Sequence, residues 1–175
     1  MKQQVVIIFV NCLLLTANSF SQAPKYSNEF LAIGVGGRAL GMSNSCVATI
    51  DDVTAGYWNP AGLLDIKNDM QFGLMHSEYF AGIAKYDYAA LARKIDTSSA
   101  FALSFIRFGV DNIPNTTELI DAAGNVDYDR VTQFSAADYA LAISYAHSPK
   151  IKGLHLGGNA KIVRRVVGKF AGAWG

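Results

Sequence analysis

Residues Asp138–Ala146, which read DYALAISYA, alternate strictly between two kinds of side chain. The large side chains at every second position are Tyr139, Leu141, Ile143 and Tyr145. The positions between them are small or polar and comprise Asp138, Ala140, Ala142 and Ser144. A period of two places these two sets on opposite faces of a strand. An apolar face bracketed by tyrosines suits a lipid-facing strand with aromatic girdles, and small residues opposite it suit a wet or plugged interior.

The same alternation recurs on both sides of this stretch and predicts an all-β fold with an antiparallel sheet. In Ile83–Arg93, for example, Tyr86 and Tyr88 oppose Lys85 and Asp87. The expected strands are Gln71–His76, Ile83–Arg93, Ala100–Phe108, Asp138–Ala146, Leu154–Ile162 and a sixth from Val166 onward.

The segment Ala100–Phe108 is the least regular of these strands. Phe101, Leu103 and Phe105 share one face of it with Arg107. Two explanations stay open: either the long Arg107 side chain extends to the membrane edge, or a β-bulge shifts the register.

The expected connections alternate in length. Lys94–Ser98 and Ser148–Lys152 are short turns, whereas Val110–Gln133 is a long polar loop. In an antiparallel sheet, this order places both short turns at one end and the long loop at the other, as in outer-membrane barrels. We therefore expect an antiparallel transmembrane β-barrel that is incomplete in this chain. A soluble β-sandwich is the alternative, because it is built from similar alternating strands.

The chain begins with the pattern of a secretory signal peptide, which we assign to residues 1–21. A short positive segment precedes the apolar run Val5–Ala17, and small residues before Gln22 indicate cleavage at that point. Cys12 invites a lipoprotein interpretation, which its very early position disfavours. After cleavage Cys46 is the only cysteine, so no intramolecular disulfide is expected. We therefore expect an exported protein that is not held together by disulfides.

The composition excludes several other classes of protein. The formal net charge of the 175 residues is +1, which gives no basic footprint for nucleic acid. Hydrophobic residues make up 51% of the chain and the mean hydropathy is +0.19. Charged residues make up 17%, below the roughly 25% of soluble domains. The chain is apolar overall, yet it holds no run of about 20 apolar residues that would form a spanning helix.

Residues 22–66 differ from the rest and are expected to form a compact N-terminal hatch, or plug, of short helices and turns. The most informative element of this segment is Asn59-Pro60-Ala61-Gly62, which follows Trp58. Asparagine before proline is held out of the α region and is a good N-cap, and proline suits the first helical position. This predicts a stop followed by a tight helical turn.

Asp51 and Asp52 open the block that ends at Leu63. Two adjacent carboxylates could form an acid pair, but we favour a helix-capping role ahead of Val53. Residues 34–39 read GVGGRA and fit the dinucleotide fingerprint G-x-G-x-x-A. That mechanism needs a preceding strand and a βαβ unit, which this segment lacks, so close backbone packing is the favoured role of its glycines.

No residue pattern indicates catalysis. His76, His147 and His155 have no partner at the spacing of metal ligands. We therefore expect no catalytic residue, no cofactor and no metal site, and predict that the protein is not an enzyme. The candidate site is instead the structural hatch motif, comprising Asp51, Asp52, Trp58, Asn59, Pro60, Ala61 and Gly62.

Several stretches together resemble the PorV/PorQ family, a branch of the FadL-like outer-membrane barrels. The N-terminal ones are Lys25–Leu31, Gly36–Met42, Val47–Ala48, Asp51–Asp52 and Tyr57–Leu63. Phe134–Ala140 and Gly157–Lys161 are similar to the middle of that family. The resemblance covers most of the mature chain, and its most specific part is the block from the paired aspartates to Asn-Pro-Ala-Gly.

The resemblance implies a carrier or adaptor barrel that acts in type IX protein secretion. Such a barrel lies in the bacterial outer membrane, receives secreted cargo proteins and passes them to other secretion-system proteins. The alternative is a FadL-like channel for hydrophobic small molecules. The family's barrels have more strands than the six that begin within residues 67–175, so we expect this chain to be an N-terminal fragment of a longer barrel.

Overall fold

The computed structural model describes residues 28–121, 124–149, 151 and 153–175. The expected signal peptide, its cleavage site and Cys12 lie outside the described residues, as does the segment 25–27 of the family resemblance. Short helices come first: η1 (Glu29–Ala32), α2 (Gly37–Gly41), α3 (Ala55–Trp58) and η2 (Pro60–Asp65). The strands are β1 (Met70–Tyr79), β2 (Ala84–Lys94), β3 (Ser99–Asn115), β4 (Thr132–His147), β5 (Leu156–Val167) and β6 (Ala171–Trp174), with η3 (Tyr128–Arg130) between β3 and β4.

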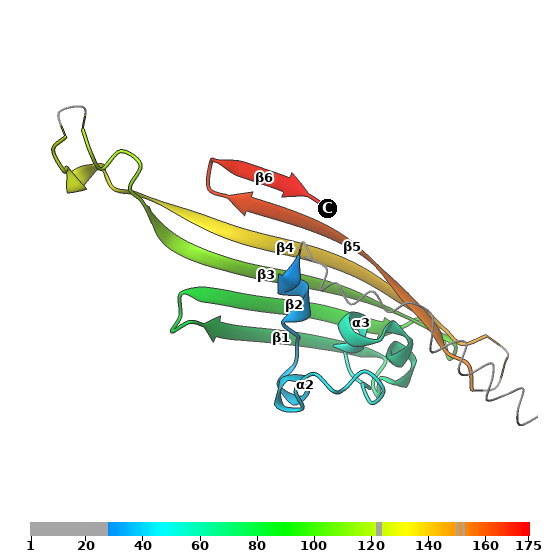
Figure 1. The fold of residues 1–175 in the computed structure, drawn as a ribbon. Helices are drawn as coiled ribbons and strands as arrows, with labels where there is room; N and C mark the ends of the chain where they lie inside the picture. Colours follow the sequence, from blue (N-terminus) through cyan, green and yellow to red (C-terminus); the bar gives the residue numbers. More distant parts are fainter. Residues whose placement is uncertain (1–27, 122–123, 150, 152) are drawn as a thin grey trace, which may run out of the picture.

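The strands form one antiparallel sheet in which each strand pairs with its neighbours in sequence. Figure 1 shows this order as a continuous run of strands from β1 to β6. The antiparallel, mostly β architecture is therefore confirmed. Within the described residues the sheet does not close on itself, because β1 pairs only with β2 and β6 pairs only with β5. Among the described residues, none of the helices combines the length and the hydropathy that a membrane-spanning helix needs.

The sixth strand was expected from Val166 onward, and this boundary is wrong. Val166 and Val167 still belong to β5, where they pair with Ala137 and Ala136. The chain then turns through Gly168, whose φ of 50° lies in the left-handed region that glycine tolerates. β6 consequently begins at Ala171.

The long loop is shorter than the sequence indicated. β3 continues to Asn115 and β4 begins at Thr132, so the connection covers residues 116–131. A register shift between Val110 and Ile113 lets the pairing resume after an irregularity, and Asn112 there has a φ of 59°. The polar residues after Val110 masked this continuation, because a β-bulge interrupts the alternation on which strand prediction depends.

The expected placement of the connections is confirmed. The turns after β2 and β4 lie at one end of the sheet, and the long loop after β3 lies at the opposite end with the turns after β1 and β5 (Figure 1). We call these the short-turn end and the long-loop end. The hatch, residues 28–66, lies across one face of the sheet near the short-turn end (Figure 1).

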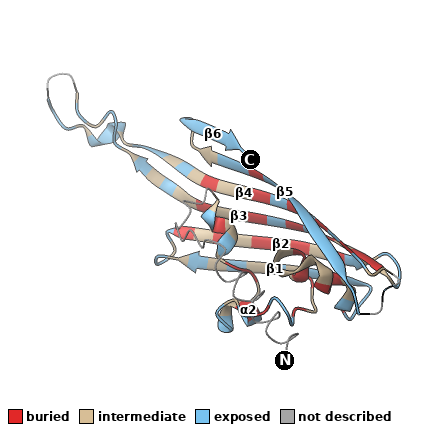
Figure 2. Cartoon of the chain, turned by 45° about the vertical axis from the view of Figure 1, so that its right-hand side comes forward, coloured by how far each residue is buried: buried red, intermediate tan, exposed pale blue. Residues whose placement is uncertain are grey.

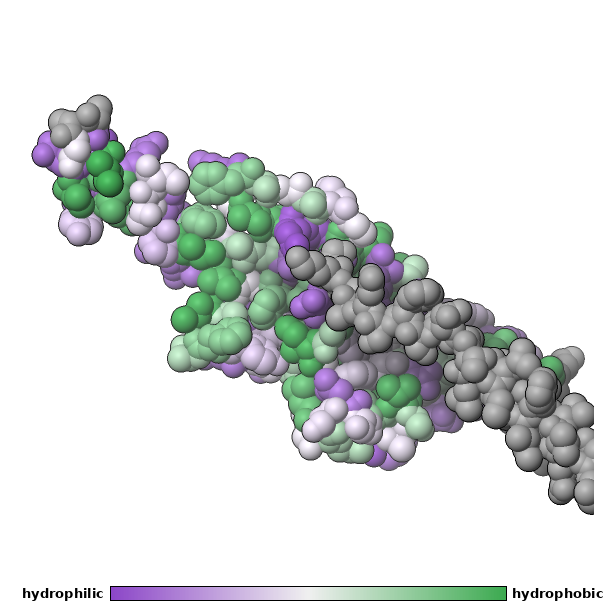
Figure 3. Space-filling view, in the orientation of Figure 1, coloured by the Kyte–Doolittle hydropathy of each residue, from purple (hydrophilic) through white to green (hydrophobic). Residues whose placement is uncertain are grey.

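Buried residues alternate with more exposed ones along the central strands, as Figure 2 shows, so the two faces of the sheet differ in burial. The inner face, which the hatch covers, carries small buried side chains along β3 and β4, among them Ala100, Ala102, Ala140, Ser144 and Ala146. The outer face carries large exposed side chains. Figure 3 views the face that carries the hatch, where hydrophobic and hydrophilic surface are mixed between the long loop and the hatch.

The hydrophobic core lies between the hatch and the inner face. Hatch residues with less than a tenth of their surface exposed include Phe30, Val35, Cys46, Leu63 and Ile66. They form one cluster with buried tyrosines and alanines of the sheet. Each fully buried aliphatic or aromatic side chain contributes roughly 1.5–3 kcal/mol, so this core holds the hatch on the sheet.

Candidate functional site

The turn at Asn59 and Pro60 has the predicted geometry. Asn59 is extended, with φ of −152° and ψ of 95°, and is the N-cap of η2. Its side-chain Oδ1 accepts a hydrogen bond from the backbone N–H of Ala61 at 3.3 Å. Pro60 occupies the start of the helix, where its missing N–H leaves no helical bond unmade. The predicted stop followed by a tight helical turn is therefore confirmed.

The same motif connects η2 to the segment of the hatch before it. The Asn59 side-chain amide donates to the carbonyl of Val47 at 3.1 Å. A Cβ on Gly62 would lie only 2.6 Å from the backbone oxygen of Ile50, so no larger residue fits without moving the chain. The indole N–H of Trp58 donates to the carbonyl of Val35 at 2.9 Å.

The two aspartates of the motif have different roles. Asp52 caps the turn before α3 as predicted: its Oδ1 accepts from the Thr54 N–H at 2.8 Å and from the Thr54 hydroxyl at 2.6 Å. The capping role is wrong for Asp51, whose carboxylate lies 3.5 Å from Arg38 and 3.4 Å from Lys67. These ion pairs are partly or largely exposed and contribute little to stability.

Tyr57, which the sequence did not single out, is central to the hatch. Its hydroxyl accepts from the Gly34 N–H at 3.1 Å and donates to the carbonyl of Leu31. Its ring makes a T-shaped contact with Trp58 at 4.8 Å between centroids, and a second with Tyr88 of β2 at 6.5 Å. Burial raises the pKa of the Tyr57 phenol, so the group stays neutral and keeps both hydrogen bonds.

Three polar groups join the hatch to β4 and β5. The carbonyl of Gly56 accepts from the buried Ser144 hydroxyl at 2.8 Å and from the Asn159 side-chain amide at 3.4 Å. The Lys161 ammonium lies 6.0 Å from the centroid of the Tyr57 ring, within the range of a cation–π contact. Neighbouring hydroxyls on Tyr86, Tyr88 and Ser104 are buried without a hydrogen-bond partner among the described residues.

Backbone contact completes this attachment. A Cβ built on Gly157 of β5 would lie 2.3 Å from the Ala61 nitrogen and 2.6 Å from the Pro60 carbonyl carbon. The hatch motif therefore rests directly on the backbone of β5. The pair of glycines at 157 and 158 inside a strand was the available signal, since glycine within a strand often marks close approach of another backbone.

On the outer face, one register level carries a row of polar and aromatic side chains across all six strands. Following the pairing, this outer row comprises His76, Asp87, Arg107, Tyr139, Arg164 and Trp174. His76 Nδ1 lies 2.6 Å from an oxygen of Asp87, and Arg107 donates to Asp111 at 2.9 Å and to Asp87 at 3.4 Å. The register is regular at Arg107, so the bulge is the wrong explanation for its position beside Phe105.

Exposed apolar residues lie on the outer face between this row and the short-turn end. They comprise Phe72, Leu74, Leu103, Phe105, Leu141, Ile143 and Ile162. Tyr139 and Tyr145 bracket the band on β4, and Ala140, Ala142 and Ser144 of the same strand are buried on the inner face, as the alternation predicted. On β2, Tyr86 and Tyr88 point inward and are buried, opposite Lys85 and Asp87.

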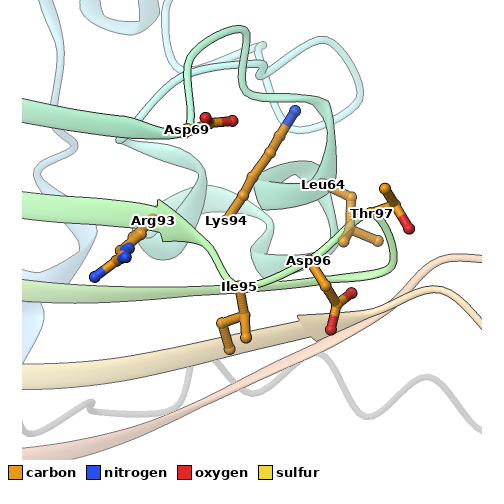
Figure 4. A pocket seen from close by; sticks show the side chains of 7 residues that line it. All are labelled: Leu64, Asp69, Arg93, Lys94, Ile95, Asp96 and Thr97. Atoms are coloured by element: carbon orange, nitrogen blue, oxygen red, sulfur yellow. The ribbon is translucent and has the colours of Figure 1, made fainter.

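A surface pocket of about 600 Å³ lies where β2 ends, close to η2 (Figure 4). Its side chains are Leu64, Asp69, Arg93, Lys94, Ile95, Asp96 and Thr97. Lys94 donates its backbone N–H to the Asp69 carbonyl at 2.8 Å, which fixes the start of β1 beside the end of β2. The lining mixes both signs of charge and includes no histidine or cysteine.

The remaining sequence candidates have structural surroundings. The glycines of residues 34–39 follow the 3₁₀ helix η1 and not a strand, and Gly34 and Gly36 have φ of 101° and 88°. His147 Nδ1 lies 3.2 Å from the Ser99 hydroxyl, and His155 lies in the turn before β5. In the part of the chain that the structure describes, no group of three or more histidine, cysteine or acidic residues could hold a metal ion.

Comparisons with protein-family models, with curated proteins and with solved structures found no match to this chain.

Proposed function

We propose that this chain forms part of an outer-membrane β-barrel of the PorV/PorQ type, acting as a non-enzymatic carrier or adaptor for cargo in type IX protein secretion. The proposal rests on the difference between the two faces of the sheet. A hatch built around Asn59 and Pro60 is seated on the inner face, and an unbroken apolar band is exposed on the outer face. The sequence resemblance supplies the family and the role.

The dimensions of the strands support membrane insertion. β1 to β5 have 10 to 17 residues, and a tilted strand needs about 9–11 to cross the hydrocarbon region. Lipid cannot satisfy the backbone N–H and C=O groups of an open edge. The proposal therefore includes further strands that pair with β1 and β6 and close the barrel.

The position of the long loop supports contact with protein partners. Residues 116–131 lie at the end opposite the hatch, and their exposed apolar side chains include Ile120, Val126 and Tyr128. Exposed apolar groups in an otherwise polar loop suit recognition of another protein surface. We therefore assign cargo or partner contact to this loop.

The first test is fractionation followed by crosslinking in cells. The full-length protein should fractionate with the outer membrane, and a photo-crosslinker at Tyr128, which is 76% exposed, should capture secreted cargo. The matched control is Ile151, which is 63% exposed in the turn after β4 at the opposite end. A soluble periplasmic protein would contradict the barrel. Equal capture at both positions, or rescue of fatty-acid uptake with no cargo bound, would contradict the adaptor role.

A further inference from the structure

The outer face holds a groove whose floor is apolar and whose rim is basic. It has a volume of about 640 Å³ and lies across β3 to β6. Phe105, Leu141 and Ile162 form the floor, one register level closer to the short-turn end than the outer row. Tyr139, Arg164 and Trp174 of the outer row form the rim. The floor continues into the exposed apolar band, so a long hydrocarbon chain could lie along it.

Arg164 is the unusual member of this rim. Its guanidinium carbon lies 4.8 Å from the centroid of the Trp174 ring, and no carboxylate within the described residues pairs with it. Two other arginines of the sheet are neutralised: Arg107 pairs with Asp111 and Asp87, and Arg165 makes two bonds to Asp138 at 2.6 and 2.8 Å. An unpaired cation at the edge of an apolar groove is complementary to a ligand with an anionic head and an apolar tail.

We propose that this groove binds a lipid with an anionic phosphate headgroup, whose phosphate is held by Arg164 and whose acyl chain lies on Phe105, Leu141 and Ile162. The planar guanidinium matches phosphate oxygens in a bidentate geometry. Stacking on Trp174 already restricts the Arg164 side chain, so binding costs it less conformational entropy. The outer row also carries the tyrosine and arginine side chains that suit the boundary between lipid and water. The inference rests on the proposed membrane insertion and names one lipid class for this surface.

Quenching of Trp174 by brominated lipid tests the proposal. The chain has two tryptophans, so Trp58→Phe leaves Trp174 as the single fluorophore. The protein is reconstituted into phosphatidylcholine vesicles that contain either dibrominated phosphatidate or dibrominated phosphatidylcholine. We expect phosphatidate to reach half-maximal quenching at about a tenfold lower mole fraction, the effect of one hydrogen-bonded charged group.

Two neighbouring arginines provide the matched pair of variants. Arg164→Gln should abolish the preference for phosphatidate, whereas Arg165→Gln, on the opposite face of the same strand, should retain it. Equal quenching by both lipids, or equal loss in both variants, would overturn the headgroup site while leaving membrane insertion intact. If neither lipid quenches, the chain has not inserted on its own, and crosslinking in the full-length protein then decides the proposal. Displacement of phosphatidate by inorganic phosphate at similar concentration would show that the acyl chain contributes nothing, which also overturns the proposal.

A second measurement covers the case in which the reconstituted chain does not fold. A photo-crosslinker at Ile162 of the full-length protein in cells grown with radioactive phosphate should acquire label, and the label should fall in the Arg164→Gln background. The control position is Val163, which is buried on the inner face. Unlabelled protein at Ile162, or equal label at both positions, contradicts the proposal.

Discussion

Replacing Gly157 by alanine should separate the hatch from β5. The added Cβ would lie 2.3 Å from the Ala61 nitrogen and 2.8 Å from its Cα, both of them backbone atoms that cannot rotate away. Gly158, the next residue, has no heavy atom within 4 Å of a Cβ built in the same way. The two adjacent glycines thus differ only in whether another backbone occupies the space beside them.

The expected cost follows from this distance. To move from 2.3 Å to an ordinary carbon contact of about 3.5 Å, η2 and β5 must separate by roughly 1 Å. Overpacking of this kind costs about 1–3 kcal/mol. The same displacement would stretch the bond from Ser144 to the Gly56 carbonyl, now 2.8 Å, because α3 and η2 are joined by a single residue. Gly158→Ala should change the free energy of unfolding by no more than about 0.5 kcal/mol.

Urea unfolding of single-tryptophan proteins measures the difference. In a Trp174→Phe background, Trp58 alone reports on the hatch, since its indole bonds to the Val35 carbonyl. Gly157→Ala should lower the midpoint for loss of the hatch signal, and Gly158→Ala should not. If both variants have the same urea midpoint as the parent protein, the hatch does not contact β5 at Gly157. If both are equally destabilised, the effect belongs to strand propensity and the contact argument is refuted.

Three further predictions concern the hatch and one turn. Asn59→Ala removes both the oxygen that caps Ala61 and the amide that donates to the Val47 carbonyl, and should destabilise by about 0.5–2 kcal/mol in thermal unfolding. Asn59→Asp loses the bond to Val47 but keeps the capping oxygen, so it should lose less; an equal loss would contradict a stabilising cap. Ser144→Ala removes the bond to the Gly56 carbonyl and should lower the free energy of unfolding by about 1 kcal/mol in the same assay. Ser104→Ala removes a buried hydroxyl that has no partner among the described residues, so it should leave the stability unchanged or raise it. Hydrogen bonds from the Ser98 N–H and hydroxyl lower the pKa of the Asp96 carboxyl. The ionised carboxylate therefore stabilises the folded protein above its unfolded pKa of about 3.9. This stabilisation is lost as the pH falls through the lower pKa of the folded state. Asp96→Ala should therefore unfold earlier than the parent at neutral pH and match it at the lowest pH; a gap independent of pH would contradict this.

The sequence was sufficient for features that depend on near neighbours along the chain. The alternation at Tyr139–Tyr145 assigned each side chain to its face, and the Asn59-Pro60 pair predicted its own turn. It was insufficient where the partner comes from another strand. Arg164 and Arg165 are evidently on opposite faces, but only the register, which sets Asp138 opposite Arg165, reveals which of them is neutralised.

The hatch motif illustrates the same limit. Asp51 and Asp52 look equivalent in sequence and the same capping role was expected of both, but only Asp52 makes the bond to the Thr54 N–H. The role of Asp51 depends on Arg38 and Lys67, which a turn within the hatch brings together. The packing partner of Asn59–Gly62 could not be predicted either, because Gly157, which it contacts, lies almost a hundred positions further along the chain.

That separation has a consequence for the order in which the molecule is assembled. The hydrogen bonds from Ser144 and Asn159 to Gly56 join residues 88 and 103 positions apart, whereas every strand pair is formed by strands that follow one another in sequence. Contacts between distant residues require a large loop to close first and form slowly. The hatch is the first part of the described chain in sequence, yet it has no surface to dock on until β4 and β5 are paired. We therefore expect an interval during folding in which the sheet exists with an uncovered inner face, and in that interval the chain is most prone to aggregation.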